Sequence, residues 1–333
     1  MSLNLFVSPS PHAKGEQTSR RIMGDVLLAL LPSLIISTIY FGVSALVVTA
    51  VAVASCVLFE SLIRHFLMGE RGFMGDLSPV VTGVLLAFNV PASLPLWIVV
   101  IGSFVAIVIA KMTFGGLGKN PFNPALVGRV FLLIAYPVQM TQFPAVEGIV
   151  DGFSGATPLA ALKSAVLPKD VLAGADTGFS LSNVSFQDML FGSIPGSLGE
   201  VASLLLIFGG LYLIFRKVIT WHTPVAVLLS MVAVAVAYGA WGGYDGVGVC
   251  EFATFHILAG GALLGAVFMA TDYATSPMTH KGMLIYGVGI GVLTMLIRLF
   301  GSYPEGMSFA ILIMNSCVPL INKYVKPRRF GVK

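Results

Sequence analysis

The stretch IMGDVLLALLPSLIISTIYF, residues Ile22–Phe41, decides the fold class of this chain. It carries one charged side chain, Asp25, in a run of otherwise apolar and small polar residues. A helix of about 20 such residues crosses a hydrocarbon core of roughly 30 Å, so the stretch predicts a membrane span. It is too long for the core of a signal peptide and lacks a convincing cleavage site, so we expect it to be retained.

The rest of the chain has the same character. Of its 333 residues, 56% are apolar and 10% are charged, which is too little polar surface to cover a protein in water. Hydropathy and loop residues together predict an all-α integral membrane protein with ten transmembrane helices. The predicted spans are 22–41, 43–66, 78–90, 94–112, 125–140, 198–215, 223–241, 252–270, 283–300 and 307–321.

The basic residues predict the orientation. A cytoplasmic N-terminus leaves only Lys163, Lys169 and Arg298 of the 19 Lys and Arg residues on the outer side. The other basic residues between the first and last spans then fall in inner loops: Arg64, Arg71, Lys111, Lys119, Arg129, Arg216, Lys217 and Lys281. This asymmetry follows the positive-inside rule, so we expect a multi-pass protein of the cell (inner) membrane with both termini in the cytoplasm.

A long polar segment, residues 141–197, divides the chain and is predicted to be extracytoplasmic. It separates five spans in residues 1–140 from five spans and a basic tail in residues 198–333. An odd number of spans in each half predicts two inverted repeats. Val80–Pro95 and Leu258–Pro277 support this, because both are glycine-containing apolar runs that break at a polar or proline-bearing stretch. Such broken helices indicate a buried site, although glycine and proline in membrane helices also serve packing alone.

The composition argues against several kinds of site. Cys56, Cys250 and Cys317 are far apart, with no CxxC pair and no clustered histidines, so we expect neither a disulfide framework nor a metal site within this chain. The basic residues form no tract with aromatic residues, so we expect no nucleic-acid partner. No GxGxxG fingerprint is present for a dinucleotide. Any electrons must therefore arrive from partner proteins.

The decapeptide DGFSGATPLA, Asp151–Ala160, places one threonine in the predicted outer segment. Gly155 and Ala156 leave the Thr157 hydroxyl uncrowded, and Pro158 disfavours the helical region for Thr157, which predicts an exposed hydroxyl. No histidine lies in this segment to act as a base, so Thr157 is not predicted to be catalytic. Covalent modification by another enzyme and a plain turn both stay open.

The same decapeptide resembles the flavinylation sequence of the RnfD/NqrB family, an acid-led motif of small residues ending in threonine. GGLGKNPFNPALVGRVFLLIAYP (Gly115–Pro137) and GAVFMATDYATSPMT (Gly265–Thr279) are also similar to that family, so the resemblance extends over nearly the whole chain. The long N-terminal extension typical of the NqrB branch is missing. The ending Ala-Thr-Pro-Leu-Ala is similar to the RnfD branch, which the resemblance therefore favours.

This resemblance implies a cofactor on the outer segment. A flavin transferase would join the phosphate of FMN to Thr157, with Asp151, Ser154 and Gly155 as the preceding motif positions. RnfD proteins are membrane subunits of the Rnf complex, which implies partner subunits A, B, C, E and G. It also implies electron transfer between ferredoxin and NAD, coupled to Na⁺ or H⁺ movement. The chain would then be one subunit of a translocase without a complete active site of its own, because the redox chemistry belongs to the flavin.

Two asparagines precede the fifth predicted span in the segment KNPFNP, residues 119–124. Asn120 and Asn123 could cap that helix, since the neighbouring prolines preset the turn. An asparagine amide also offers a donor and an acceptor, which suits the polar edge of a flavin or a quinone carbonyl. The resemblance implies a second, non-covalent flavin, riboflavin, and we expect its polar contacts at Asn120 and Asn123.

Asp272 ends the eighth predicted span on the same side as these asparagines. An ionisable group at membrane depth predicts a functional role, here as an ion ligand, a proton relay or a flavin neighbour. Because it lies near a helix end, Asp272 could instead reach water or pair with Lys281. It is our candidate for ion coupling.

Other functions also fit this sequence. A channel or solute transporter of inverted-repeat fold would use ten spans and broken helices equally well, without any need for Thr157. A structural subunit would hold redox partners together and be colourless. Within the family, an NqrB-type quinone-reducing role is a further alternative.

Overall fold

The structure is a computed structural model that describes residues 18–69, 76–143, 157–164, 185–192, 196–200, 203–243 and 246–327. Every regular element in these residues is helical, which confirms the predicted all-α class. Asp151, Ser154 and Gly155 lie outside the described residues, so their motif roles stay predictions.

Among the described residues, five helices are long and apolar enough to cross a membrane. They are α1 (Ser19–Phe41), α2 (Val43–Phe66), Leu96–Phe114, α11 (His222–Trp241) and α14 (His280–Phe300). The helix Leu96–Phe114 consists of α4 (Leu96–Phe104), a π-helical turn η1 (Val105–Ile109) and a 3-10 turn η2 (Met112–Phe114). A sixth crossing results if a pair of segments bent by 62° counts as one span: α12 (Gly246–Leu258), then α13 (Ala262–Leu264) with η4 (Gly265–Met269).

Three predicted spans are shorter in the structure than the sequence indicated. The helices there are α3 (Ser78–Phe88), α5 (Pro124–Ala135) and α10 (Ser203–Phe215). The 11 residues of α3 extend about 16 Å, roughly half of a hydrocarbon core. The apolar run continues beyond α3 because the following turn is buried in protein, where Val90, Ala92 and Leu94 are at most 4% exposed. Such irregular backbone is tolerated at membrane depth when protein surrounds it. The inverted relation of the two halves stays a prediction.

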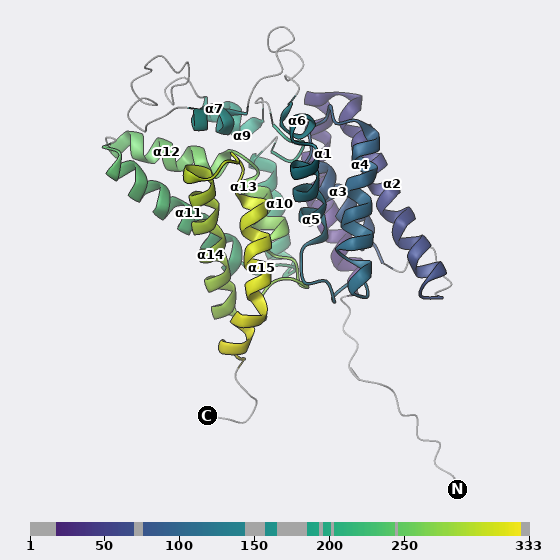
Figure 1. Cartoon of the computed structure of the whole chain (residues 1–333). Coiled ribbons are helices and arrows are strands. Elements are labelled where there is room, and N and C mark those ends of the chain that lie inside the picture. The colour runs from purple at the N-terminus through teal and green to yellow at the C-terminus, as the bar shows by residue number, and fades with distance from the viewer. Residues whose placement is uncertain are drawn as a thin grey trace.

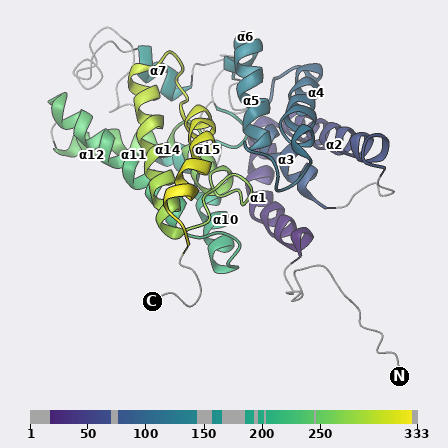
Figure 2. The ribbon, with the colours of Figure 1, turned by 60° about the horizontal axis from the view of Figure 1, so that its bottom comes forward.

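The two halves of the chain lie side by side (Figure 1). Helices α1 to α5 form one side, and α10 to α14 together with α15 (Met307–Tyr324) form the other. The short helices α6 (Pro137–Thr141), α7 (Pro158–Ser164) and α9 (Phe186–Phe191) gather at one end. At the opposite end α1 begins and α15 ends. Figure 2 shows α1 and α10 next to each other, where the two sides meet.

Glycines set the close helix contacts, as small residues do in membrane proteins. A Cβ on Gly209 of α10 would lie 2.6 Å from the Ala29 carbonyl oxygen of α1. A Cβ on Gly291 of α14 would overlap Ser230 Oγ of α11. The contact at Gly209 joins α10 to α1 and thus connects the two halves of the chain. The contact at Gly291 joins α14 to α11 within the C-terminal half.

Two arginines that were counted for the predicted orientation are buried within helices. Arg129, counted as an inner-loop residue although the predicted span 125–140 contains it, is 6% exposed within α5. Arg298, expected on the outer side, is buried in the last turn of α14. It donates to the carbonyl oxygens of the break between α12 and α13: His256 at 2.5 Å, Ala259 at 2.8 Å and Gly260 at 3.1 Å. Arg298 therefore stabilises the helix break.

Candidate functional site

A cavity of about 280 Å³ lies at the end of the bundle that carries α6 and α7, and we call it the Thr157 cavity. Its lining comes from α5, α6, α7, the end of α3 and the loop between α14 and α15: Asn89, Arg129, Leu133, Met140, Thr141, Phe143, Thr157, Ala160, Tyr303, Pro304 and Glu305. Thr157 is 4% exposed, and its hydroxyl oxygen accepts the N–H of Ala160 over 3.2 Å. The prediction of an exposed hydroxyl is therefore wrong.

The docking of α7 explains why Thr157 is buried. Leu159 and Leu162 belong to the hydrophobic core of the bundle. Lys163 Nζ donates to the Tyr303 carbonyl oxygen over 2.6 Å and reaches the Ile297 carbonyl oxygen at 3.4 Å, near the end of α14. Burial lowers the pKa of Lys163 below its ordinary value. These contacts hold α7, and with it Thr157, against the second half of the chain.

Arg129 is the cation of the Thr157 cavity. Its Nη1 donates to Asn89 Oδ1 over 3.0 Å and to Ser308 Oγ over 2.5 Å, and its Nη2 pairs with the Glu305 carboxylate. The Nε of Arg129 has no partner among the described residues. A buried guanidinium with an unused N–H beside a cavity can bind an acceptor oxygen of a ligand.

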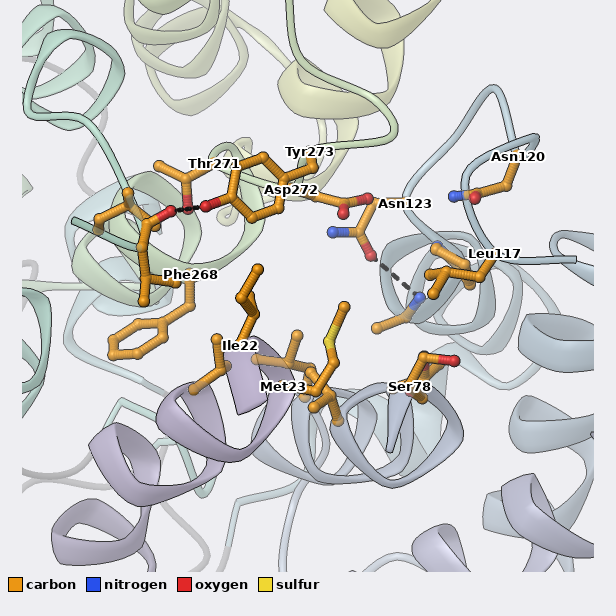
Figure 3. A pocket seen from close by; sticks show the side chains of 18 of the residues that line it. Ile22, Met23, Ser78, Leu117, Asn120, Asn123, Phe268, Thr271, Asp272 and Tyr273 are labelled. Atoms are coloured by element: carbon orange, nitrogen blue, oxygen red, sulfur yellow. Dashed lines mark hydrogen bonds between the residues drawn. The ribbon is translucent and has the colours of Figure 1, made fainter. Parts of the chain in front are cut away.

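A second cavity, of about 90 Å³, lies toward the other end, near the start of α1, and we call it the Asp272 cavity (Figure 3). Ile22 and Met23 of α1, Leu117 and Phe268 contribute apolar walls, while Asn120, Asn123 and Asp272 contribute polar groups. The three residues predicted for the second flavin and for ion coupling therefore lie around one cavity. They come from the loop before α5 and from the turn after η4.

The two asparagines differ in what they leave free. Asn123 caps α5, because its Oδ1 accepts the N–H groups of Ala125 at 3.1 Å and Leu126 at 3.4 Å. Its Nδ2 donates to the Met269 carbonyl oxygen over 3.2 Å. Asn120 donates from Nδ2 to a nearby carbonyl, but its buried Oδ1 has no partner in the described part of the chain. The capping interpretation therefore describes Asn123, whereas Asn120 keeps an acceptor for a ligand.

Asp272 is held by its own turn rather than by a cation. Its Oδ1 accepts the Ala274 N–H at 3.5 Å, and its Oδ2 accepts the Thr275 hydroxyl at 3.2 Å. Within the described residues it forms no ion pair, and the suggested pairing with Lys281 is absent. Burial raises the pKa of Asp272 above its ordinary value, although the two hydrogen bonds and the charge of Lys111 oppose this shift.

A network of charged side chains lies behind the Asp272 cavity. Lys111, 1% exposed, lines the cavity, and its Nζ lies 2.6 Å from Glu60 Oε2 and 2.5 Å from Ser78 Oγ. Arg64 Nη2 lies 2.7 Å from Glu60 Oε1 and 3.3 Å from Asp76 Oδ2, so it pairs with both carboxylates. Burial acts to raise the pKa of Asp76. Two hydrogen bonds from Ser78 and the charges of Lys111 and Arg64 outweigh burial, so the pKa of Asp76 lies below its ordinary value.

The two cavities are neighbours along α3 and α5. Leu85 of α3 lines the Asp272 cavity, and Asn89, which ends that helix, lines the Thr157 cavity. On α5, Ala125 lines the Asp272 cavity and Arg129, four residues later, lines the Thr157 cavity. Four residues rise about 6 Å in a helix. Met269 lies at this boundary, since its sulfur is 3.6 Å from Asn89 Nδ2.

Sequence reasoning missed the charged residues that complete both cavities. Arg129 and Lys111 were assigned to inner loops, and Glu305 was not singled out. The available signal was their position within or beside apolar runs, where an ionisable residue marks a functional or paired group. Their partners come from distant parts of the chain and could not be read from local sequence.

The family model for the NQR2, RnfD, RnfE family matches residues 6–331. The chain belongs to this family. The family assignment agrees with the sequence resemblance to the RnfD/NqrB family noted above for Gly115–Pro137 and Gly265–Thr279. These stretches contain the loop before α5 and the turn that carries Asp272, and both contribute to the lining of the Asp272 cavity.

Curated members of the family are similar along nearly their whole length. The chain is 43% identical to the D subunit of the Na⁺-translocating ferredoxin:NAD⁺ oxidoreductase complex of Acetobacterium woodii, covering 99% of this chain and 96% of that protein. It is 40% identical to the D subunit of the proton-translocating ferredoxin:NAD⁺ oxidoreductase complex of Clostridium ljungdahlii, covering 99% and 97%. It is 37% identical to the D subunit of the ion-translocating oxidoreductase complex of Cellvibrio japonicus, covering 97% and 94%.

Proposed function

We propose that this chain is a flavin-carrying membrane subunit of an Rnf-type complex. FMN is bound covalently to Thr157, riboflavin is bound in the Asp272 cavity, and the complex transfers electrons between ferredoxin and NAD with coupled Na⁺ or H⁺ translocation. The names of the relatives support the complex and its coupling, and they include both a sodium and a proton translocase. The partners are then the other subunits, A, B, C, E and G, and a flavin transferase for maturation.

The position of the Thr157 hydroxyl carries this proposal. Thr157 lines a cavity of about 280 Å³ that is also lined by Arg129, whose Nε has no partner among the described residues. A group attached at Thr157 Oγ1 would thus have space beside it and a cation within the same cavity. Bound flavin supplies reversible one- and two-electron chemistry, and the chain supplies its position and electrostatics.

The Asp272 cavity fits riboflavin in its chemistry. Asn120 Oδ1 is a buried acceptor without a partner among the described residues, which suits an imide N–H of the flavin ring. Apolar walls on the α1 side suit the flat ring faces. The cavity of about 90 Å³ holds only part of a three-ring system, so side chains at its border must move on binding. Leu117, which is 37% exposed, is placed to do so.

The intact mass of the protein from its native membrane tests the covalent site. We expect a mass increase equal to one phosphodiester-linked FMN, and we expect Thr157→Ala to lose it. Thr141→Ala is the matched control, because Thr141 lines the same cavity and its hydroxyl bonds only to carbonyls of its own helix. The control should retain the added mass. In-gel flavin fluorescence after denaturation should follow the same pattern.

An unmodified native protein would refute the proposed covalent flavin. The channel, transporter or scaffold alternatives would then gain support. Loss of the added mass from both threonine variants would show that the cavity, and not Thr157, determines modification. Reduction of a quinone rather than NAD by the assembled complex would support the NqrB-type alternative.

A further inference from the structure

The charged network behind the Asp272 cavity reaches from the cavity wall to the protein surface. Lys111 and Ser78 line the cavity, and Lys111 Nζ donates to Ser78 Oγ over 2.5 Å. Ser78 Oγ in turn donates to Asp76 Oδ1 over 2.5 Å. Lys111 is almost fully buried, whereas 15% of the Asp76 side chain is exposed. Two short hydrogen bonds therefore connect a buried ammonium group with a carboxylate at the surface.

Lys111 keeps one N–H for the cavity. A lysine ammonium has three donors. Glu60 Oε2 and Ser78 Oγ take two of them, and the third has no partner in the described residues. Because the side chain lines the cavity, this donor is available to a ligand bound there.

The remaining hydroxyls of the lining are already used. Thr82, Thr271 and Tyr273 each donate to a backbone carbonyl oxygen. Asp272 faces the cavity from the opposite element and is held by Ala274 and Thr275. Of the described lining groups, only Lys111 and Ser78 are linked by hydrogen bonds to a titratable group at the surface.

We propose that Asp76, Ser78 and Lys111 form a proton relay from the surface to the Asp272 cavity. The relay rests on the proposed function, since a ligand in this cavity gains negative charge when the partner subunits reduce it. Lys111 Nζ then gives one proton to the ligand. It regains a proton from Ser78 Oγ as the Asp76 carboxyl group, which has first taken a proton from hydronium at the surface, returns one to the serine oxygen. One proton enters at the surface and one reaches the ligand.

The other members of the network hold the relay but do not carry the proton. Arg64 stays charged at any working pH and cannot release a proton. It positions Asp76 and Glu60 through ion pairs of 3.3 and 2.7 Å. Glu60 stabilises the charged form of Lys111 across 2.6 Å and so favours its reprotonation by Ser78 after each transfer.

The relay is tested by proton uptake in the purified native complex. A chemical reductant is mixed with the complex in weak buffer, and a pH-indicator dye reports protons while absorbance reports flavin reduction. We expect Ser78→Ala to slow proton uptake about a hundredfold, as for loss of one group in acid–base transfer. Asp76→Asn, a residue outside the cavity lining, should slow uptake similarly. Ser78→Thr, which keeps the hydroxyl, should restore it, and the wild-type rate should fall in D₂O.

Ser55→Ala is the matched control. Ser55 is 8% exposed, and its hydroxyl bonds to the Val51 and Ala52 carbonyl oxygens of its own helix. Wild-type proton uptake in both Ser78→Ala and Asp76→Asn, with riboflavin content unchanged, would overturn the relay alone. Wild-type complex that releases no riboflavin on denaturation would overturn the proposed second flavin and the relay together. The two failures are therefore distinguishable.

Discussion

The Thr157 cavity and the Asp272 cavity share α3 and α5 but are built differently. The Thr157 cavity is larger, about 280 against 90 Å³, and its charged groups are one cation, Arg129, and one carboxylate, Glu305. The Asp272 cavity is small, and polar groups of several elements converge on it. On the proposal above, a covalent bond at Thr157 would retain the ligand of the larger cavity. Convergent polar groups can retain a ligand without such a bond.

The largest expected effect separates Arg129 from an exposed arginine. Arg129→Met leaves Glu305 buried without its partner, so we expect a loss of about 3–5 kcal/mol of stability. Arg216 is the comparison, because it pairs with Asp25 and 37% of its side chain is exposed. Arg216→Met should cost less, about 1–3 kcal/mol, because the Tyr212 hydroxyl still donates to the buried Asp25 carboxylate. Thermal unfolding of both variants in detergent measures the difference, and equal losses would contradict a structural role for Arg129.

The second effect concerns coupling within the network behind the Asp272 cavity. Lys111→Met and Glu60→Gln should each destabilise the protein, because each leaves the other partner buried. In Lys111→Met, Arg64 still pairs with Glu60, so that loss should be smaller than for Arg129→Met. The double variant should lose less than the sum, by about 0.5–3 kcal/mol. Strictly additive losses in a denaturation series would show that the 2.6 Å pair contributes no coupling.

A smaller effect tests how firmly α7 covers the Thr157 cavity. Lys163→Met removes the hydrogen bond to the Tyr303 carbonyl oxygen, worth about 1 kcal/mol. In a Thr157→Cys background, maleimide labelling of the new cysteine should therefore speed up about fivefold, because local opening becomes easier. Cys250, which is exposed, is the internal reference and should react at one rate in both proteins. Unchanged labelling at position 157 would show that Lys163 does not hold α7.

The smallest effect is the pH dependence contributed by Asp76. Its pKa is lowered on folding, so its contribution to stability is fully present above the ordinary aspartate value of about 3.9. That contribution is lost as the pH falls through the lower, folded-state pKa. Asp76→Asn should therefore flatten the decline of the melting temperature below about pH 4 and leave the slope above about pH 5 unchanged. An identical acid decline in both proteins would contradict the lowered pKa.

The sequence predicted the helical class and the residues of the Asp272 cavity better than those of the Thr157 cavity. Asn120, Asn123 and Asp272 lie in motifs, so they could be found, although which asparagine caps α5 depended on the fold. Arg129 was counted as a loop residue although it lies in the fifth predicted span, and its burial depends on partners at Asn89, Ser308 and Glu305 that are distant in sequence. The burial of Thr157 could not be predicted, since it depends on α7 packing against the distant loop at Tyr303.

Helix length was the other limit of the sequence. Hydropathy measures apolar character, and the buried turn after α3 is as apolar as a span although its backbone is not helical. The ten predicted spans therefore include segments that protein, rather than lipid, surrounds.

The measurement that tests the account most directly is the flavin content of Thr157→Ala beside Asn120→Leu, each purified in its native complex. In-gel fluorescence of this chain reports covalent FMN, and chromatography after denaturation reports released riboflavin. The account predicts that Thr157→Ala loses only the covalent flavin and that Asn120→Leu loses only the riboflavin. Loss of both flavins from either folded variant, or of neither from both, would contradict two separate flavin sites.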